Sequence, residues 1–240
     1  MPLVSIIIPA YNEEKSIVQT VNKIREYNKN WDVIVINDGS SDKTEQLCKE
    51  NSIPFISLVM NLGIGGAVQT GYKYAFENDY DIAIQFDGDG QHNIDFVNSL
   101  IEPIKNLEFD FVIGSRFISG DRKGFISSPL RRLGIKIISI LIFILTRKKI
   151  YDPTSGFRAA NKRIIEYFAN EYPIEFPEPE SVTLLFKQNY RVKEIPVIMY
   201  ERQGGKSSIY AWKSAYYMVN VLFSLIIVSL RDYNKIDKKL

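Results

Sequence analysis

The chain has 240 residues, of which 45% are hydrophobic, enough for one large domain or two small ones with a sizeable core. Its net charge of +2 argues against a nucleic-acid binder that works through a basic surface. The single cysteine, Cys48, excludes an intramolecular disulfide and a multi-cysteine zinc site, and it indicates a reduced, cytosolic compartment. The N-terminus lacks a basic region, so we expect no signal peptide.

The first 115 residues alternate apolar runs with helical patterns. The apolar runs predict buried strands at 3–8, 32–37, 53–59, 81–86 and 109–115. Helical patterns cover 13–27 and the stretch from the glycines at 63–66 to about 78. This rhythm predicts an α/β fold with an open, mostly parallel sheet flanked by helices.

A polar cluster follows each predicted strand. The clusters are PAYNE, NDGSSD, NLGIGG, DGDGQH and SRF. Open parallel sheets bind ligands beyond the carboxyl ends of their strands, so these clusters predict one site along that edge. In NDGSSD, Ser40 or Ser41 is placed to cap the next helix, and Asp38 is either a turn residue or an acceptor for a nucleotide base. The glycines of NLGIGG either cradle phosphate at a helix N-terminus or permit close helix packing.

The stretch DGDGQH, residues 87–92, is a candidate site for a hard divalent cation. Mg²⁺ and Mn²⁺ prefer oxygen ligands, and Asp87, Asp89 and Gln91 offer them directly after a buried strand. A solvated turn is the alternative interpretation of two such carboxylates. His92, the only histidine, is expected to pack or cap rather than to bind the metal.

Basic side chains near these clusters are candidates for holding phosphate, because arginine forks match phosphate oxygens. They are Arg116, Arg131, Arg132, Arg158, Arg202 and Lys206. A solvated charged face is the alternative for each. The stretch PEPES places Glu178 and Glu180 ahead of a helical pattern, where each is either first-turn charge that suits the helix dipole or a general base.

Two longer apolar runs follow, at 133–146 and 215–230. Each is shorter than the roughly 20 residues that a membrane-spanning helix needs, and basic residues flank both. One interpretation is a pair of helices buried in a large core. The other is a pair of amphipathic helices that lie in a membrane interface.

Taken together, these motifs resemble family-2 glycosyltransferases of the GT-A fold, above all the polyprenyl- and dolichyl-phosphate sugar synthases. The matching stretches are VSIIIPAYNEE, NDGSSD, NLGIGGAVQTGYKYA, DGDGQH, VIGSRF, DPTSGFRAANK and ERQGGKSSI, in this order over about residues 3–209. The resemblance implies a catalytic domain over 1–209, with an interface helix at 130–146. Residues 210–240 are then a C-terminal amphipathic extension, an apolar helix with a basic tail.

The resemblance also implies roles for individual residues. The donor nucleotide would be held by Pro9, Tyr11, Glu13, Asp38 and Asp87, and Mg²⁺ or Mn²⁺ by Asp87, Asp89 and Gln91. The acceptor phosphate would face Arg116, Arg131, Arg132 and Ser155, and Arg202 would close over the site. Catalysis is accordingly assigned to Asp89, Arg116, Arg131, Glu178, Glu180 and Arg202.

The expected reaction is inverting, metal-dependent transfer of a hexose or N-acetylhexosamine from a UDP-sugar to a polyprenyl phosphate. A lipid phosphate is already ionised and needs no base. Transfer to a saccharide hydroxyl, the first alternative, would need Glu178 or Glu180 as a general base. The second alternative is a non-catalytic sugar-nucleotide-binding subunit.

The PEPES segment and the short C-terminal run depart from the dolichyl-phosphate mannose pattern. They look more like bacterial relatives that load glucose or N-acetylglucosamine onto undecaprenyl phosphate for cell-wall or surface polysaccharides. Some of those relatives work beside a small membrane protein. We therefore expect peripheral attachment at the cytoplasmic face of the cell membrane, and no nucleic-acid partner.

Overall fold

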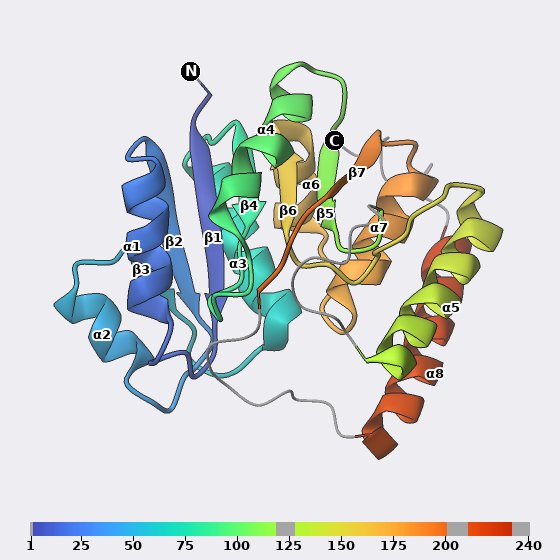
Figure 1. The fold of residues 1–240 in the computed structure, drawn as a ribbon, viewed down its shortest axis with the longest axis horizontal. Coiled ribbons are helices and arrows are strands. Elements are labelled where there is room, and N and C mark those ends of the chain that lie inside the picture. The colour runs from blue at the N-terminus through green and yellow to red at the C-terminus, as the bar shows by residue number, and fades with distance from the viewer. Residues whose placement is uncertain (1, 119–127, 201–210, 232–240) are drawn as a thin grey trace.

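The computed structural model describes residues 2–118, 128–200 and 211–231, with side chains in the last segment described from residue 217 on. One seven-stranded sheet lies between two layers of helices (Figure 1). Its strands are β1 (Val4–Ala10), β2 (Trp31–Asn37), β3 (Phe55–Ser57), β4 (Ile82–Gln85), β5 (Phe111–Ser115), β6 (Arg158–Asn161) and β7 (Val192–Pro196). The helices are α1 (Ile17–Tyr27), α2 (Thr44–Glu50), α3 (Gly63–Glu77), α4 (Val97–Lys105), α5 (Pro129–Thr146), α6 (Lys162–Asn170), α7 (Pro177–Lys187) and α8 (Ala211–Leu230), with a short 3₁₀ turn, η1 (Ile94–Phe96).

The sheet has the strand order β3-β2-β1-β4-β6-β5-β7. All neighbouring strands run parallel except at β6, which is antiparallel to both β4 and β5. The prediction of a mostly parallel α/β sheet is therefore confirmed. All five predicted strands are present.

Two predicted elements are shorter in the structure. The run 53–59 yields only the three residues of β3, because its end leaves the sheet and Val59 is fully exposed. The helix expected over 13–27 begins at Ile17. Before it, the carbonyl of Glu13 accepts hydrogen bonds from the amides of Ser16 and Ile17, so residues 13–16 form the turn that leads into α1.

The sheet is buried on both faces, which explains why its strands are continuous apolar runs. On one face, Ile6 and Ile8 of β1 pack with residues of α1, α2 and α4. On the other face, Ile7 packs with residues of α3, α5, α6, α7 and α8. Alternate side chains of a strand point to opposite faces, so β1 contributes to both cores.

Strand β6 is an element that the apolar pattern does not predict. Its sequence, RAAN, is too short and too polar at its ends to stand out. Because β6 is antiparallel to β4, its start meets the end of β4, with Gln85 opposite Arg158. The segment 153–157 that leads into β6 therefore reaches the same edge of the sheet as the loops that follow β1, β2 and β4.

Helices α5 and α8 pack against each other and against α7, and together they cover one side of the molecule (Figure 1). Helix α5 buries Ile135, Ile138 and Ile142, while α8 buries Val221 and Leu225. Both helices also carry exposed apolar side chains. The exposed large side chains are Leu130, Leu133, Ile137, Ile140, Phe143 and Ile144 on α5, and Val219, Phe223, Ile226, Ile227 and Leu230 on α8.

Both helices therefore bury part of their apolar surface in the core and expose the rest. The interpretation as interfacial helices stays a prediction. Within the described ranges, no helix is both long and apolar enough to cross a membrane.

Candidate functional site

A polar cavity of about 640 Å³ opens where the loops after β1, β2 and β4 meet the segment before β6 and the first turn of α7. Seven of the predicted site residues line it: Pro9, Tyr11, Glu13, Asp38, Asp87, Asp89 and Glu178. We call this cavity the donor pocket, after the sugar-nucleotide donor that the sequence resemblance implies for its residues. Five of its lining side chains are carboxylates, and its described lining includes no lysine or arginine.

The loops after β1 and β2 are fastened to each other through Asn12. The side-chain oxygen of Asn12 accepts hydrogen bonds from the amides of Ser41, at 2.8 Å, and Asp42. Its own amide donates to the hydroxyl of Ser40. The expectation that Ser40 or Ser41 caps the next helix is therefore wrong: α2 begins later, at Thr44, and Asp42 accepts the hydrogen bond from the Thr44 amide.

Asp38 connects the loop after β2 to the start of α3. One of its oxygens accepts a 2.7 Å hydrogen bond from the amide of Leu62, and the side chain is almost entirely buried. Burial raises the pKa of this carboxyl, and hydrogen bonds from the backbone at Leu62 and Gly63 partly offset the effect. Asp38 thus lines the pocket wall, and its carboxylate is held in place by hydrogen bonds from the backbone.

The glycines of α3 serve mainly close packing. A Cβ at Gly65 would lie 2.3 Å from the backbone oxygen of Ile174, and one at Gly71 would lie 2.1 Å from a methyl group of Ile7. Gly63, by contrast, has open space around it and lines the donor pocket. The packing interpretation therefore holds for the interior glycines, while the helix start faces the pocket.

Asp87 is fixed by its neighbour His92. The amide of Asp87 donates to Nδ1 of His92, so the imidazole proton is on Nε2, which lies 3.3 Å from the Asp87 carboxylate. The imidazole stacks on Phe157 and is buried, which lowers the pKa of His92 to about 4. As predicted, His92 packs, and it also holds Asp87 from behind.

Asp89 and Gln91 follow Asp87 in the same loop after β4. The Asp89 side chain is buried at the pocket, and one of its oxygens accepts from the Gln91 amide. Gln91 is not among the lining residues; its side-chain nitrogen donates to the carbonyl of Tyr200 at 3.4 Å. Across the residues with described positions, no group of three or more His, Cys, Asp or Glu side chains forms a protein-only metal cage.

Helix α7 separates the two glutamates of PEPES. Glu178 lines the donor pocket, whereas Glu180 faces α8 and accepts a hydrogen bond from Ser224. Burial raises the pKa of both carboxyls; Arg158 partly offsets this for Glu178, and Ser224 does so for Glu180. Of the two, only Glu178 lines the pocket, and the catalytic role assigned to Glu180 stays a prediction.

Arg116 is engaged within the protein. Its guanidinium forms two hydrogen bonds of 2.6 and 2.7 Å to the buried Asp152 and a third to the hydroxyl of Thr154. Ser155 is buried, and its hydroxyl accepts from the amide of Phe157. Thr154 lines the donor pocket, whereas Arg116 and Ser155 do not, and the acceptor-phosphate role assigned to these two residues stays a prediction.

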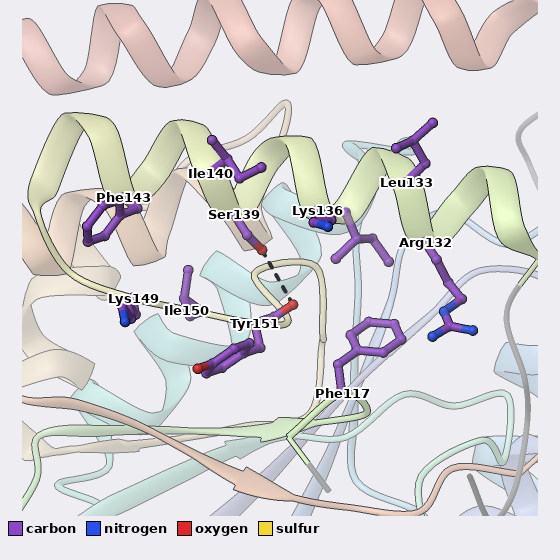
Figure 2. Close-up of a pocket in the computed structure, with 11 residues that line it drawn as sticks. Phe117, Arg132, Leu133, Lys136, Ser139, Ile140, Phe143, Lys149, Ile150 and Tyr151 are labelled. Atoms are coloured by element: carbon purple, nitrogen blue, oxygen red, sulfur yellow. Dashed lines mark hydrogen bonds between the residues drawn. The ribbon is translucent and has the colours of Figure 1, made fainter. Parts of the chain in front are cut away.

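A second cavity, of about 490 Å³, runs beneath α5 (Figure 2). We call it the α5 groove. Its walls are largely apolar, and three basic side chains stand among them. The lining residues are Phe117, Arg132, Leu133, Ile135, Lys136, Ser139, Ile140, Phe143, Lys149, Ile150 and Tyr151.

The chain that returns from α5 forms the floor of this groove. The hydroxyl of Ser139 on α5 donates to the carbonyl of Tyr151, which fastens the return segment to the helix (Figure 2). Phe117 stands at the end of the groove beside Arg132, directly after Arg116 in the chain. Arg131 and Arg132 are both exposed in the first turn of α5. Arg202 and Lys206 lie outside the described residues.

Several lining residues of the donor pocket are not among the predicted site residues. They include Asn12, Asn61, Gly63, Thr154 and Gly156. All of them belong to the quoted motifs, but none is a charged residue that would suggest chemistry by itself. Gly156 has a clear geometric reason: a Cβ there would lie 3.1 Å from an Asp87 oxygen and from the Gln85 amide nitrogen.

Comparison with known proteins agrees with this arrangement. The sequence pattern of the family described as "Glycosyl transferase family 2" matches residues 5–168, well over half of the chain. A UDP-N-acetylglucosamine–dolichyl-phosphate N-acetylglucosaminyltransferase of Methanococcus voltae is 34% identical over 81% of this chain and 84% of its own length. An undecaprenyl-phosphate mannosyltransferase of Micrococcus luteus is 28% identical over 85% of this chain and 86% of its own.

Among solved structures, glucosyl-3-phosphoglycerate synthase from Mycobacterium tuberculosis, in complex with Mn²⁺, UDP and phosphoglyceric acid, superposes with a TM-score of 0.72. It covers 97% of this chain and 80% of its own at 17% identity. This likeness shows the GT-A-like fold. Together with the sequence match, it establishes that the chain belongs to glycosyl transferase family 2.

Proposed function

We propose that this transferase moves a sugar from a UDP-sugar to a polyprenyl phosphate at a membrane surface. The observation that carries the proposal is the pairing of two unlike cavities: an acidic donor pocket at the sheet edge and an apolar, basic-flanked groove under α5. A soluble sugar acceptor would have no use for the second cavity. The relatives from Methanococcus and Micrococcus are named for lipid-phosphate acceptors, which supports the same acceptor class.

The donor nucleotide is assigned to the part of the pocket formed by Pro9, Tyr11, Glu13 and Asp38. Tyr11 is half exposed and is available to stack on a base. Asp38 lines the pocket with its carboxylate anchored by the Leu62 amide, and it would accept a hydrogen bond from a base or ribose group. Uracil is favoured because the Methanococcus relative is named for a UDP-sugar.

The donor set fits a divalent cation, Mg²⁺ or Mn²⁺, shared between protein and diphosphate. Asp87 and Asp89 both line the pocket, and two carboxylates leave most of a hard cation's coordination positions to water and phosphate oxygens. Gly156 keeps the space beside Asp87 free of a side chain. When bound, the cation would neutralise the charge of the leaving UDP. Gln91 would contribute only after giving up its contact with Tyr200.

The acceptor phosphate is assigned to the α5 groove at the first turn of α5. Arg132 lines the groove, and Arg131 stands next to it in the first turn of α5. The isoprenoid would then lie along the apolar walls, which bury hydrocarbon favourably. Because a phosphate monoester is already ionised at neutral pH, it attacks the anomeric carbon from the face opposite UDP without a base, and the configuration inverts.

In that reaction Glu178 orients the sugar by accepting hydrogen bonds from its hydroxyls at the pocket wall. The specific sugar is proposed to be N-acetylglucosamine or glucose, since the Methanococcus relative is named for the first. The outer faces of α5 and α8 would rest on the cytoplasmic leaflet as a peripheral attachment, alone or beside a small membrane protein. The product would supply cell-wall or surface polysaccharide synthesis.

Transfer to a saccharide hydroxyl is the second candidate, because Glu178 faces the pocket with a raised pKa, as a general base requires. A screen of UDP-sugars with undecaprenyl phosphate and with soluble saccharides, each with Mg²⁺ or Mn²⁺, separates the two. We expect a lipid-linked sugar phosphate. Product only from saccharides would establish the second candidate, and metal-bound UDP-sugar without any transfer would point to a binding subunit.

A further inference from the structure

The donor pocket poses an electrostatic problem. Its five carboxylates would surround a nucleotide diphosphate that is itself negatively charged, and no lysine or arginine stands in the described lining. A divalent cation offsets part of this charge. Like charges repel strongly at short range when water is excluded. Further positive charge near the pocket would therefore strengthen binding of the diphosphate.

Arg158, at the start of β6, supplies a positive charge immediately behind the wall. Its side chain is completely buried, and it is the largest of the fully buried side chains in the described structure. The guanidinium donates to the carbonyls of Ser155, Pro153 and Glu178, at 2.5, 3.0 and 2.9 Å. A fourth bond, of 2.7 Å, goes to the hydroxyl of Ser181.

All four acceptors are neutral. Among the described residues no carboxylate lies within ion-pair distance of Arg158. The guanidinium also lies over the ring of Phe111, and the residue opposite Arg158 in the register of β4 is the neutral Gln85. Buried charges are usually paired with an opposite charge. Here dipoles solvate the guanidinium without cancelling its charge.

The hydrogen bonds of Arg158 lead directly to the pocket. Pro153 and Ser155 flank Thr154, and Ser155 precedes Gly156; Thr154 and Gly156 both line the cavity. The third carbonyl belongs to Glu178, which lines it as well. The charge of Arg158 also reaches the pocket, since it lowers the pKa of the Glu178 carboxyl against the larger effect of burial.

We propose that Arg158 is a positioning residue whose buried charge also attracts the anionic diphosphate of the donor. Its hydrogen bonds to Pro153, Ser155 and Glu178 hold the wall residues Thr154, Gly156 and Glu178 at the cavity, and its charge, which forms no direct ion pair among the described residues, acts through the backbone of that wall. This inference rests on the proposed donor site. It goes beyond the proposed donor site because Arg158 would raise the affinity for the donor without touching the ligand.

The test compares two probes, UDP and uridine, which share the base and ribose and differ in charge. Binding of each is titrated without divalent cation to wild type and to the Arg158→Met and Arg158→Gln variants. We expect UDP affinity to fall about tenfold or more while uridine affinity changes less than twofold. Arg158→Lys keeps the charge but loses the fork, so its ratio of UDP to uridine affinity should stay near the wild-type value.

Arg191→Met is the matched control. Arg191 forms an ion pair with Asp110 and is half exposed, and it is absent from the pocket lining. Arg191→Met removes the same charge and should change the affinities for UDP and for uridine by less than twofold. An Arg191→Met effect equal to that of Arg158→Met would reduce the proposal to a loss of net charge and so overturn it.

The outcomes are distinct. Equal losses for UDP and uridine in Arg158→Met and Arg158→Gln would show a purely structural arginine, and no loss for either probe would also overturn the proposal. Where neither neutral variant folds, Arg158→Lys decides, because a collapse of its UDP-to-uridine ratio contradicts a role for the charge. A wild-type protein that binds neither probe would contradict the proposed donor site instead.

Discussion

The donor pocket and the α5 groove solve different recognition problems with different means. In the pocket, polar side chains such as Asn12 and His92 hold the loops through specific hydrogen bonds, so the ligand groups are fixed before any ligand arrives. In the groove, most of the lining side chains are apolar, and the floor at Tyr151 is fastened by hydrogen bonds from the Ser139 hydroxyl to its carbonyl and from its amide to Glu194. The first arrangement favours directional chemistry, and the second favours a flexible hydrocarbon chain.

The largest expected effect comes from the metal side of the donor pocket. Asp89→Ala should lower turnover roughly a thousandfold or more, because a divalent cation contributes several kcal/mol to stabilising the leaving group. Initial rates at saturating UDP-sugar measure the loss. Asp79→Ala, which removes an exposed carboxylate on the protein surface, is the control and should be neutral. Near-normal turnover of Asp89→Ala would refute the metal site.

Helix α7 allows a sharper comparison within the pocket itself. Glu178→Gln should slow transfer to polyprenyl phosphate by about tenfold, because the amide keeps one acceptor for the sugar hydroxyls but removes the charge. Since burial holds the pKa of Glu178 above its ordinary value of 4.5, wild-type activity should fall with decreasing pH as this carboxyl protonates, and the Gln variant should lose that limb of the rate profile. Complete loss of turnover with intact UDP binding would instead favour a general base.

On the membrane side, one apolar residue should matter for attachment and not for the donor. Phe223→Glu, at a position that is 63% exposed on α8, should weaken binding to anionic vesicles about tenfold, since burying a phenylalanine contributes about 1.5–3 kcal/mol. Vesicle sedimentation measures it. Phe76→Glu, an exposed phenylalanine on α3, is the matched control. Equal losses in both variants would remove α8 from the attachment surface.

The smallest effect concerns Glu180, the buried neighbour of Glu178. Its pKa in the folded protein is raised, so the folded state binds its proton more tightly than the unfolded state. The resulting stability is present at low pH and is lost as pH rises through the folded pKa. Glu180→Gln should therefore unfold at an equal or slightly higher temperature at neutral pH, with turnover within twofold of wild type. A large loss of turnover would return Glu180 to the active site.

The sequence predicts the sheet edge around the donor pocket well because the strands there are continuous apolar runs, and their polar ends must meet at one edge. Asp38, Asp87 and Asp89 accordingly line a common cavity. The pattern is less informative where a residue's direction depends on packing. Glu178 and Glu180 are two residues apart, which on a helix turns them to different sides, and the start of α7 is not visible from composition alone.

The arginines illustrate the same limit. Their charge suggests phosphate, but Arg116 is bound to Asp152 and Arg158 is wholly buried. Recognising either role requires knowing that β6 runs antiparallel beside β4, which brings the 153–157 segment to the site. A four-residue strand has too few side chains to show the alternation of apolar and polar residues that identifies a strand. This part of the site can therefore be recognised only from the tertiary structure.

The most direct test of the division between the two cavities is the pair of Michaelis constants for donor and lipid acceptor in Phe143→Glu. Phe143 lines the groove, and Ile144→Glu, at the exposed neighbouring position outside the lining, is the control. We expect the constant for undecaprenyl phosphate to rise about tenfold relative to that control, with the constant for the UDP-sugar within twofold of wild type. An unchanged lipid constant, or an equal rise in both constants, would contradict a separate lipid site under α5.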